Sequence, residues 1–206
     1  MNLEIIALLA CAYLVGSIPC GVVLTRLFSD VDVTKEGSGN IGAFNVFCVA
    51  GKRLGIMTLA GDVLKGALPV LFAVYRLHPP GGKSEILVCL VALLAFLGHL
   101  FPIFFHFKGG KGVATAAGCF MVISPYAFVV CALVYVMVLC FSGYSSAGSL
   151  SAATILPAAT WFATHSVVIT GCALIMTALI FVRHADNIKR LRNGTERSAW
   201  ERRWGK

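Results

Sequence analysis

The chain has 206 residues, of which 58% are hydrophobic and 13% are charged, and its mean hydropathy is +0.86. Soluble globular domains carry about 25% charged residues, so this composition excludes an ordinary soluble protein and indicates an integral membrane protein. The net charge of +8 lies in short loops and a tail, which argues against nucleic-acid binding. Membrane spans need roughly 17 to 25 residues, so the length predicts a single transmembrane domain, 1–206, with a basic tail over about 184–206.

Seven apolar runs predict an all-α bundle of about seven transmembrane helices. In chain order they cover Leu3 to Phe28, Leu54 to Leu77, Ile86 to Phe107, Val113 to Ile123, Pro125 to Phe141, Gly148 to Thr164 and Val167 to Val182. The fourth run is too short to cross a hydrocarbon core of ~30 Å upright, so it predicts a half-span, a re-entrant piece or a helix that starts inside a polar cavity. The last two runs are separated by few residues and alternatively form one helical hairpin.

The distribution of charge predicts how the bundle is oriented. Residues 1–15 contain no basic residue, which favours a retained first helix over a cleaved signal peptide. The N-terminus is then expected on the outside. Lys and Arg flank the first and third connections and crowd the tail, whereas the connection His78 to Glu85 has Lys83 alone. The positive-inside rule then places the C-terminus in the cytoplasm and gathers the polar loops on one membrane face.

The eight cysteines lie mostly inside the apolar runs and show no CxxC spacing. They are interpreted as small hydrophobic residues that pack between helices. No metal site is predicted.

Two glycine-rich polar segments interrupt the apolar pattern, and the first is KEGSGNIGAFN, residues 35–45. Exposed amides and lysines cannot face lipid, so this segment is expected at an interface or in a cavity, where short polar groups can surround an oxyanion. The candidate substrate-binding residues here are Lys35, Gly37, Ser38, Gly39, Asn40, Gly42 and Asn45. A plain connecting turn is the alternative.

The second segment is FKGGKG, residues 107–112, directly before the short apolar run. It lacks the spacing of a P-loop, but it forms a cationic nest at the start of a helix, whose partial positive end attracts anions. The candidate anion-binding residues here are Lys108, Gly109, Gly110, Lys111 and Gly112.

Ionisable residues inside the apolar runs are functional candidates. Asp62 and Lys65 are three residues apart, so a neutralising pair on one helical face is the alternative, and His99 lies close to the second glycine-rich segment. In the tail, His184 and Asn187 share a helical face, and His184 titrates in a range suited to proton transfer. An interfacial basic helix is the alternative for the tail.

Several long segments of irregular composition follow one another in a fixed order: GSIPCG, KEGSGNIGAFNV, GDVLKGALPV, GHLFPIFFHFKGGKGVAT and RHADNIKRLRNGTE. From about Gly16 to Glu196 they resemble the bacterial acyl-phosphate:glycerol-3-phosphate acyltransferase family, PlsY. The resemblance implies a seven-helix inner-membrane enzyme with a cytoplasmic active site. The implied reaction moves an acyl group from acyl phosphate to the 1-hydroxyl of sn-glycerol 3-phosphate, giving lysophosphatidic acid and phosphate in phospholipid biosynthesis.

The resemblance also implies roles for single residues. It makes Ser38, Lys111, His184 and Asn187 the catalytic candidates. Ser146 and Ser149 match a serine-bearing turn with an auxiliary, substrate-binding role.

The chain departs from the family pattern at Cys48, where the family usually has arginine. A thiol cannot replace a bidentate guanidinium, so Lys52 or Arg53 becomes the candidate to reach the same anion. Phe44, where a small polar residue is commoner, is a lesser departure.

An acyl phosphate is already an activated mixed anhydride, so we expect direct attack by the glycerol hydroxyl without a covalent acyl-enzyme. The proton acceptor is either His184 or a phosphate oxygen of the donor. The expected partners are the two substrates and membrane lipids, with no cofactor and no obligatory protein partner. The alternative function is a membrane transporter or channel for a phosphorylated solute, although such proteins often carry midplane broken helices and the polar loops here cluster at one face.

Overall fold

The computed structural model describes residues 3–77 and 83–200. Residues 1–2, 78–82 and 201–206 lie outside the described part. They include much of the connection 78–85 and the end of the tail, on which the predicted orientation partly depends.

Within the described ranges all regular secondary structure is helical, which confirms the predicted all-α class. In chain order the helices are α1 (Leu3–Gly16), α2 (Cys20–Phe28), α3 (Ala43–Ala50), α4 (Lys52–Leu77), α5 (Lys83–Leu100), the 3₁₀ helix η1 (Ile103–Phe105), α6 (Val113–Ile123), α7 (Pro125–Ser142), α8 (Ser145–Thr164), α9 (Val167–Arg183) and α10 (Ala185–Arg192).

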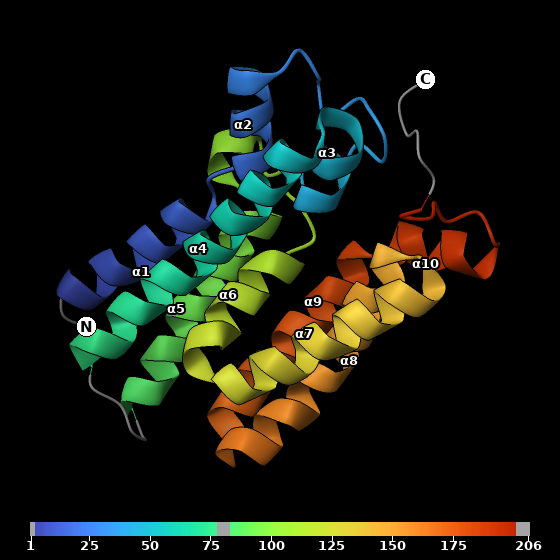
Figure 1. Cartoon of the computed structure of the whole chain (residues 1–206). Helices are drawn as coiled ribbons and strands as arrows, with labels where there is room; N and C mark the ends of the chain where they lie inside the picture. The colour runs from blue at the N-terminus through green and yellow to red at the C-terminus, as the bar shows by residue number, and fades with distance from the viewer. Residues whose placement is uncertain (1–2, 78–82, 201–206) are drawn as a thin grey trace.

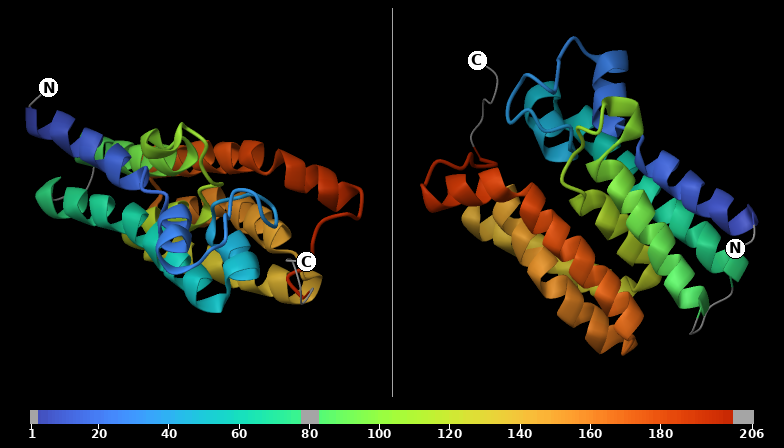
Figure 2. Two further views of the ribbon diagram at one scale, coloured as in Figure 1. Left: turned by 90° about the horizontal axis from the view of Figure 1, so that it is seen from above. Right: turned by 180° about the vertical axis from the view of Figure 1, so that it is seen from behind.

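The long helices form two groups that lie side by side (Figure 1). Helices α1, α4, α5 and α6 pack on one another, and α7, α8 and α9 form the second group. The groups meet where α6 contacts α7 and α5 contacts α9. The short helices α2, α3 and α10 gather at the end of the molecule away from the N-terminus (Figures 1 and 2), so the polar segments of the sequence converge there.

Large buried side chains fix the two groups against each other. Phe96 of α5 and Phe120 of α6 are almost fully buried, as are Met176 and Ile180 of α9, and all four belong to one hydrophobic core. Burying a side chain of this size stabilises a fold by about 1.5–3 kcal/mol where water is the alternative. Within the first group, α6 approaches α4 so closely that a Cβ on Gly118 would collide with the Val63 carbonyl.

Three segments in the described part are each long and apolar enough to cross a membrane: Lys52–Leu77, Lys83–Phe105 and Pro125–Ser142. The number rises to five if α1 with α2, which meet at 47°, and α9 with α10, which meet at 60°, each count as one span. These helices fit a multi-pass membrane protein. The count of seven spans and the orientation of the two ends stay predictions.

The first predicted run is two helices. Helix α1 ends at Gly16 and α2 begins at Cys20, because Pro19 lacks an amide donor and disfavours helical geometry in the residue before it. A further difference is α3, an eight-residue helix that begins at Ala43 inside the first glycine-rich segment, where only a loop was expected.

Candidate active site

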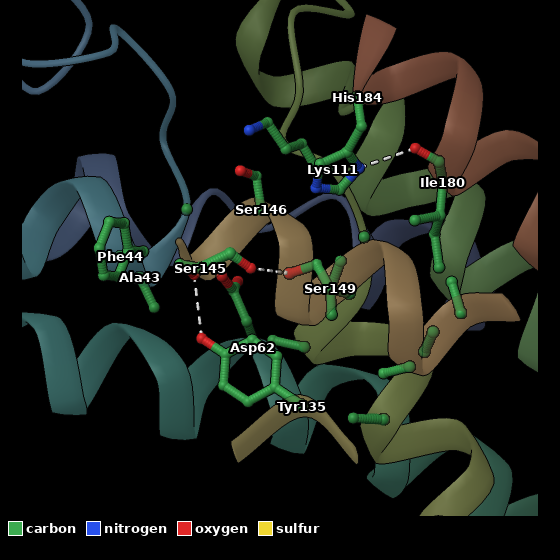
Figure 3. A pocket seen from close by; sticks show the side chains of 18 of the residues that line it. Ala43, Phe44, Asp62, Lys111, Tyr135, Ser145, Ser146, Ser149, Ile180 and His184 are labelled. Atoms are coloured by element: carbon green, nitrogen blue, oxygen red, sulfur yellow. Dashed lines mark hydrogen bonds between the residues drawn. The ribbon is translucent and has the colours of Figure 1, made fainter. Parts of the chain in front are cut away.

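A cavity of about 690 Å³ lies between the two helix groups. Its walls come from the first glycine-rich loop with α3, from α4, the end of α5 and the start of α6, and from α7, α8, α9 and the tail. Lys111, His184 and Ser146 lie together in the lining (Figure 3), and the apolar side chains that α6, α7 and α8 contribute, among them Ala116, Phe128 and Leu156, are called here the apolar limb. The cavity can therefore hold a molecule with a charged head and a hydrocarbon chain.

Lys111 and the tail meet in a connected set of hydrogen bonds at the polar end. Lys111 Nζ donates to Asn187 Oδ1 at 2.6 Å, and Asn187 Nδ2 donates to Glu196 Oε1 at 2.6 Å. Glu196 also accepts from Ser146 Oγ at 2.5 Å and from Arg190 Nε at 2.7 Å. The set joins the start of α6 to α8, α10 and the segment after α10.

The environment sets the charges of this network. Burial lowers the pKa of Lys111 to about 8, and the nearby Glu196 carboxylate counteracts part of that effect. Burial raises the pKa of Glu196, but the hydrogen bonds from Ser146, Asn187 and Arg190 outweigh it and hold the pKa below its usual value. At pH 7 this network therefore contains an ammonium group, a guanidinium group and a carboxylate.

His184 occupies the break between α9 and α10, with 1% of its surface exposed. Its Nδ1 lies 2.8 Å from the Ile180 carbonyl oxygen, and since a carbonyl can only accept, Nδ1 carries the proton. Burial and the positive charge of Lys111 lower the pKa of His184 to about 4. The ring is therefore neutral at pH 7 with Nε2 as an acceptor, and it reaches into the same part of the cavity as Lys111 (Figure 3).

Asn45 holds the first glycine-rich loop from within. Its side chain, 3% exposed, accepts from the Ser38 amide at 2.9 Å and donates to two carbonyls of the preceding turn at 3.0 and 3.2 Å. Asn40 Oδ1 likewise accepts from the Gly42 amide at 2.8 Å. Two amides that were candidates for an anion thus bond inside the loop, and the anion contacts of this loop stay predictions.

Gly112 starts α6 at the cavity wall. Its φ of +82° lies in the left-handed region, and a Cβ there would collide with the Phe96 and Leu100 side chains, so glycine is required on both counts. Helix α6 spans Val113–Ile123, as its sequence run predicted. Of the three possibilities for that run, the structure supports a helix that starts inside a polar cavity.

Most of the predicted site residues line this cavity: Gly37, Ser38, Asn40, Gly42, Asn45, Lys111, Gly112, Ser146, Ser149, His184 and Asn187. The remaining predicted residues, Lys35, Gly39, Lys108, Gly109 and Gly110, lie outside its lining. Lys35 instead pairs with Asp32 at 3.3 Å on the exposed surface. Whether these residues bind substrate stays a prediction.

Cys48 also lies outside the cavity lining, on α3. Burial raises its pKa to about 11, so it is a neutral thiol at pH 7. Lys52 and Arg53, the candidates to replace the arginine expected at this position, are exposed and do not line the cavity either. The guanidinium groups on the cavity wall come from Arg190 and Arg197.

The sequence reasoning missed Arg190 and Glu196 as site residues. Arg190 was interpreted only as a lipid anchor, although it follows His184 and Asn187 at the same spacing of three and so continues their helical face. Glu196 was harder to predict from the sequence, because its place in the network depends on the chain folding back after α10. Asp62 and His99, which were candidates, line the cavity wall opposite the tail.

The ion pair predicted as the alternative for Asp62 and Lys65 is present, with Lys65 Nζ 2.8 Å from Asp62 Oδ1. The eight cysteines are all free thiols. Cys89, Cys119 and Cys172 are buried between helices, as the interpretation as packing residues predicts, whereas Cys11 and Cys140 are exposed.

Comparison with known proteins identifies the family. The family model described as glycerol-3-phosphate acyltransferase matches residues 6–194. The chain belongs to this family. It is 46% identical to the glycerol-3-phosphate acyltransferase of Syntrophotalea carbinolica over 92% of this chain and 94% of that protein, and 46% identical to that of Myxococcus xanthus over 93% and 97%.

Two solved structures of PlsY, an integral membrane glycerol 3-phosphate acyltransferase, resemble the fold closely. The glycerol 3-phosphate form gives a TM-score of 0.88 and the lysophosphatidic acid form 0.86, each at 36% identity over 95% of both chains. Membership of this family favours the acyltransferase over the alternative of a transporter or channel.

Proposed function

We propose that this chain transfers the acyl group of an acyl phosphate to the 1-hydroxyl of sn-glycerol 3-phosphate, releasing lysophosphatidic acid and phosphate for phospholipid synthesis. The supporting observation is a single cavity that joins Lys111, Asn187 and His184 to an apolar limb. The charged end suits the phosphate groups of both substrates, and the limb suits the acyl chain of the donor. The two PlsY structures similar to this chain are described as glycerol 3-phosphate and lysophosphatidic acid forms.

In the proposed reaction the glycerol hydroxyl oxygen attacks the acyl carbon, and the bond from that carbon to the phosphate oxygen breaks. The electron pair leaves with the phosphate. Lys111, at the positive end of α6, stabilises the charge that develops on this leaving group. Because the mixed anhydride is already activated, no covalent acyl-enzyme is required.

The hydroxyl proton passes to a phosphate oxygen of the donor. The phosphate oxygens gain negative charge as the bond to the acyl carbon breaks, whereas His184, whose pKa is about 4, is a weak base. Its Nε2 therefore acts by accepting a hydrogen bond from the hydroxyl and orienting it toward the acyl carbon. Ser38 and Ser146 supply hydroxyl groups on the facing walls of the cavity.

The proposed location is the bacterial inner membrane, with the polar end of the cavity facing the cytoplasm. The basic residues of α10 and the first loop belong to that end, and Lys and Arg concentrate on cytoplasmic faces. Phosphorylated glycerol can then reach the site from water, while the acyl chain enters from the bilayer.

The test is acylation of labelled glycerol 3-phosphate by the detergent-purified chain, with palmitoyl phosphate and palmitoyl-CoA as alternative donors at equal concentration. We expect lysophosphatidic acid from palmitoyl phosphate and no product from the thioester. Product from palmitoyl-CoA alone would overturn the proposed donor. A Lys111→Ala variant controls for contaminating activity, since its preparation should contain the same impurities.

A further inference from the structure

A buried ionic cluster lies on α4 and α5, and two of its members, Asp62 and His99, contribute to the cavity lining. Asp62, Lys65 and His99 are 2%, 5% and 4% exposed. Lys65 Nζ lies 2.8 Å from Asp62 Oδ1 and donates to the Ile18 carbonyl at 2.7 Å, and His99 Nδ1 lies 3.6 Å from the same Asp62 oxygen. Ionisable groups at membrane depth are costly and mark functional positions. A neutralising pair accounts for Asp62 and Lys65 but leaves His99 unexplained.

His99 packs against the loop that precedes Lys111 and supports it. The Gly110 amide donates to the His99 carbonyl at 3.2 Å. A Cβ on Gly110 would collide with Nε2 of the His99 ring, and a Cβ on Gly109 would collide with the His99 and Leu100 carbonyls. The two glycines therefore lie directly against the end of α5, and the ring of His99 supports the backbone one residue before Lys111.

Arg183 holds the same two glycines from the other helix group. Its Nε donates to the Gly110 carbonyl at 3.1 Å and its Nη2 to the Gly109 carbonyl at 2.6 Å. The loop is thus held between the end of α5 and the end of α9. Since the two residues that precede Lys111 are fixed, the direction of the lysine side chain toward Asn187 depends on where His99 lies.

We infer that His99, backed by the Asp62 carboxylate, is a positioning residue that sets Lys111 for phosphate binding. His99 contributes to the cavity lining, but both ring nitrogens are directed at protein groups, Nδ1 at Asp62 and Nε2 at Gly110, so the ring is placed to act through the loop. The inference rests on the proposed role of Lys111. A catalytic group held by a second layer of side chains stays near its productive geometry, and a misplacement of ~1 Å can cost about 10²-fold in rate.

The test compares His99→Gln and His99→Leu with the parent chain by measuring kcat/KM for glycerol 3-phosphate across pH 6.5–9.5. His106→Asn is the matched control, because His106 is exposed in the preceding turn, outside the cavity lining, at a φ of 52° that asparagine tolerates. We expect His99→Leu to lose about 10²-fold at pH 7, His99→Gln to keep more of the rate because it retains a polar end, and His106→Asn to match the parent.

The pH profile separates positioning from general damage. Burial lowers the pKa of Lys111 most, and the charges of Arg190 and Arg183 act in the same direction, whereas Glu196 and Asp186 raise it. None of these charged groups changes in the variants. A loosened loop returns Lys111 to water, so the basic limb of the profile should move to higher pH in His99→Leu. An unmoved limb with an undiminished kcat/KM would overturn the inference.

A double-mutant cycle with Lys111→Ala gives the decisive result. If His99 acts through Lys111, adding His99→Leu to Lys111→Ala should change kcat/KM by less than about threefold, because the two losses are not additive. Equal losses in both backgrounds would overturn the inference, and thermal unfolding midpoints identify any variant that fails to fold. The same four variants are also compared by calorimetric measurement of glycerol 3-phosphate binding, which needs no acyl donor. A failure of the proposed acyl-phosphate reaction can then be distinguished from a failure of the positioning role.

Discussion

Lys111 Nζ and Asn187 Oδ1 lie 2.6 Å apart, although the residues are separated by 76 positions in the chain. The bond joins the first helix group to the tail that follows the second. It also places the ammonium group beside His184, whose pKa responds to its charge. The candidate active site is therefore assembled across the boundary between the two groups.

Replacing Lys111 with alanine should lower kcat/KM for glycerol 3-phosphate by about 10²–10³-fold, because a charge-stabilising donor is lost from a site with little water. Steady-state kinetics with palmitoyl phosphate measures the change. Lys189→Ala is the control, since Lys189 is exposed on α10 and lies outside the cavity lining. Equal losses in both variants would indicate a general effect of charge on substrate attraction.

The activity should fall as the pH rises through about 8. Burial lowers the pKa of Lys111 to about 8, so the amine replaces the ammonium form above that pH and kcat/KM declines about tenfold per unit. A bound phosphate favours the charged form, so the corresponding limb in kcat should lie at higher pH. In Lys111→Arg the side chain at position 111 stays charged over the whole pH range. If the activity of this variant still falls at high pH, the fall is due to another residue.

The imidazole of His184 should stay neutral down to about pH 4, far below the usual histidine range, because of burial and the charge of Lys111. Nitrogen NMR of histidine-labelled protein measures this directly, with His184→Asn assigning the signal. We expect a protonated Nδ1 and a bare Nε2 at pH 6. His184→Ala should reduce kcat by about 10²-fold through loss of hydroxyl orientation, and a variant that keeps most of its rate would remove His184 from the mechanism.

Glu196→Gln should shift the basic limb of the profile to lower pH, the opposite direction from His99→Leu. The Glu196 carboxylate raises the pKa of Lys111, so its neutralisation lets the ammonium group lose its proton sooner. Glu85→Gln is the control, since Glu85 lies in the first turn of α5, outside the cavity lining. A limb that moves upward in Glu196→Gln would mean that the tail shields Lys111 from water more than it supplies charge.

The apolar limb of the cavity should determine which acyl chains fit. Ala152 lines it from α8 and is buried, so Ala152→Phe should shorten the available space. The ratio of kcat/KM for palmitoyl phosphate to that for octanoyl phosphate should fall about tenfold or more. Ala158→Phe lies on an exposed face of the same helix and should leave the ratio unchanged.

The sequence predicted those features that depend on neighbours in the chain. The bounds of α6 followed from glycine before it and Ser124 with Pro125 after it, since these residues stop and start helices locally. Between residues 3 and 28 the prediction followed hydropathy alone and missed the break, although Gly16 and Pro19 mark it locally.

The site was predictable where one short segment carries several polar groups, as at Lys111 or at His184 with Asn187. It was not predictable where a partner arrives from elsewhere. Glu196 joins Ser146 only because the tail folds back, and the amide of Ala199 donates to the Gly143 carbonyl at 2.7 Å to hold it there. Such contacts depend on tertiary structure that no local pattern records.

The folding back of the tail has a consequence for the order of events during synthesis. A nascent chain that has reached only the end of α8 already contains Lys111 and Ser146, but His184, Asn187 and Glu196 have not yet been made. The unfinished enzyme therefore holds a cationic loop without the groups that fix its geometry. Acyl transfer should begin only after Glu196 has been made and the tail has folded back against Ser146.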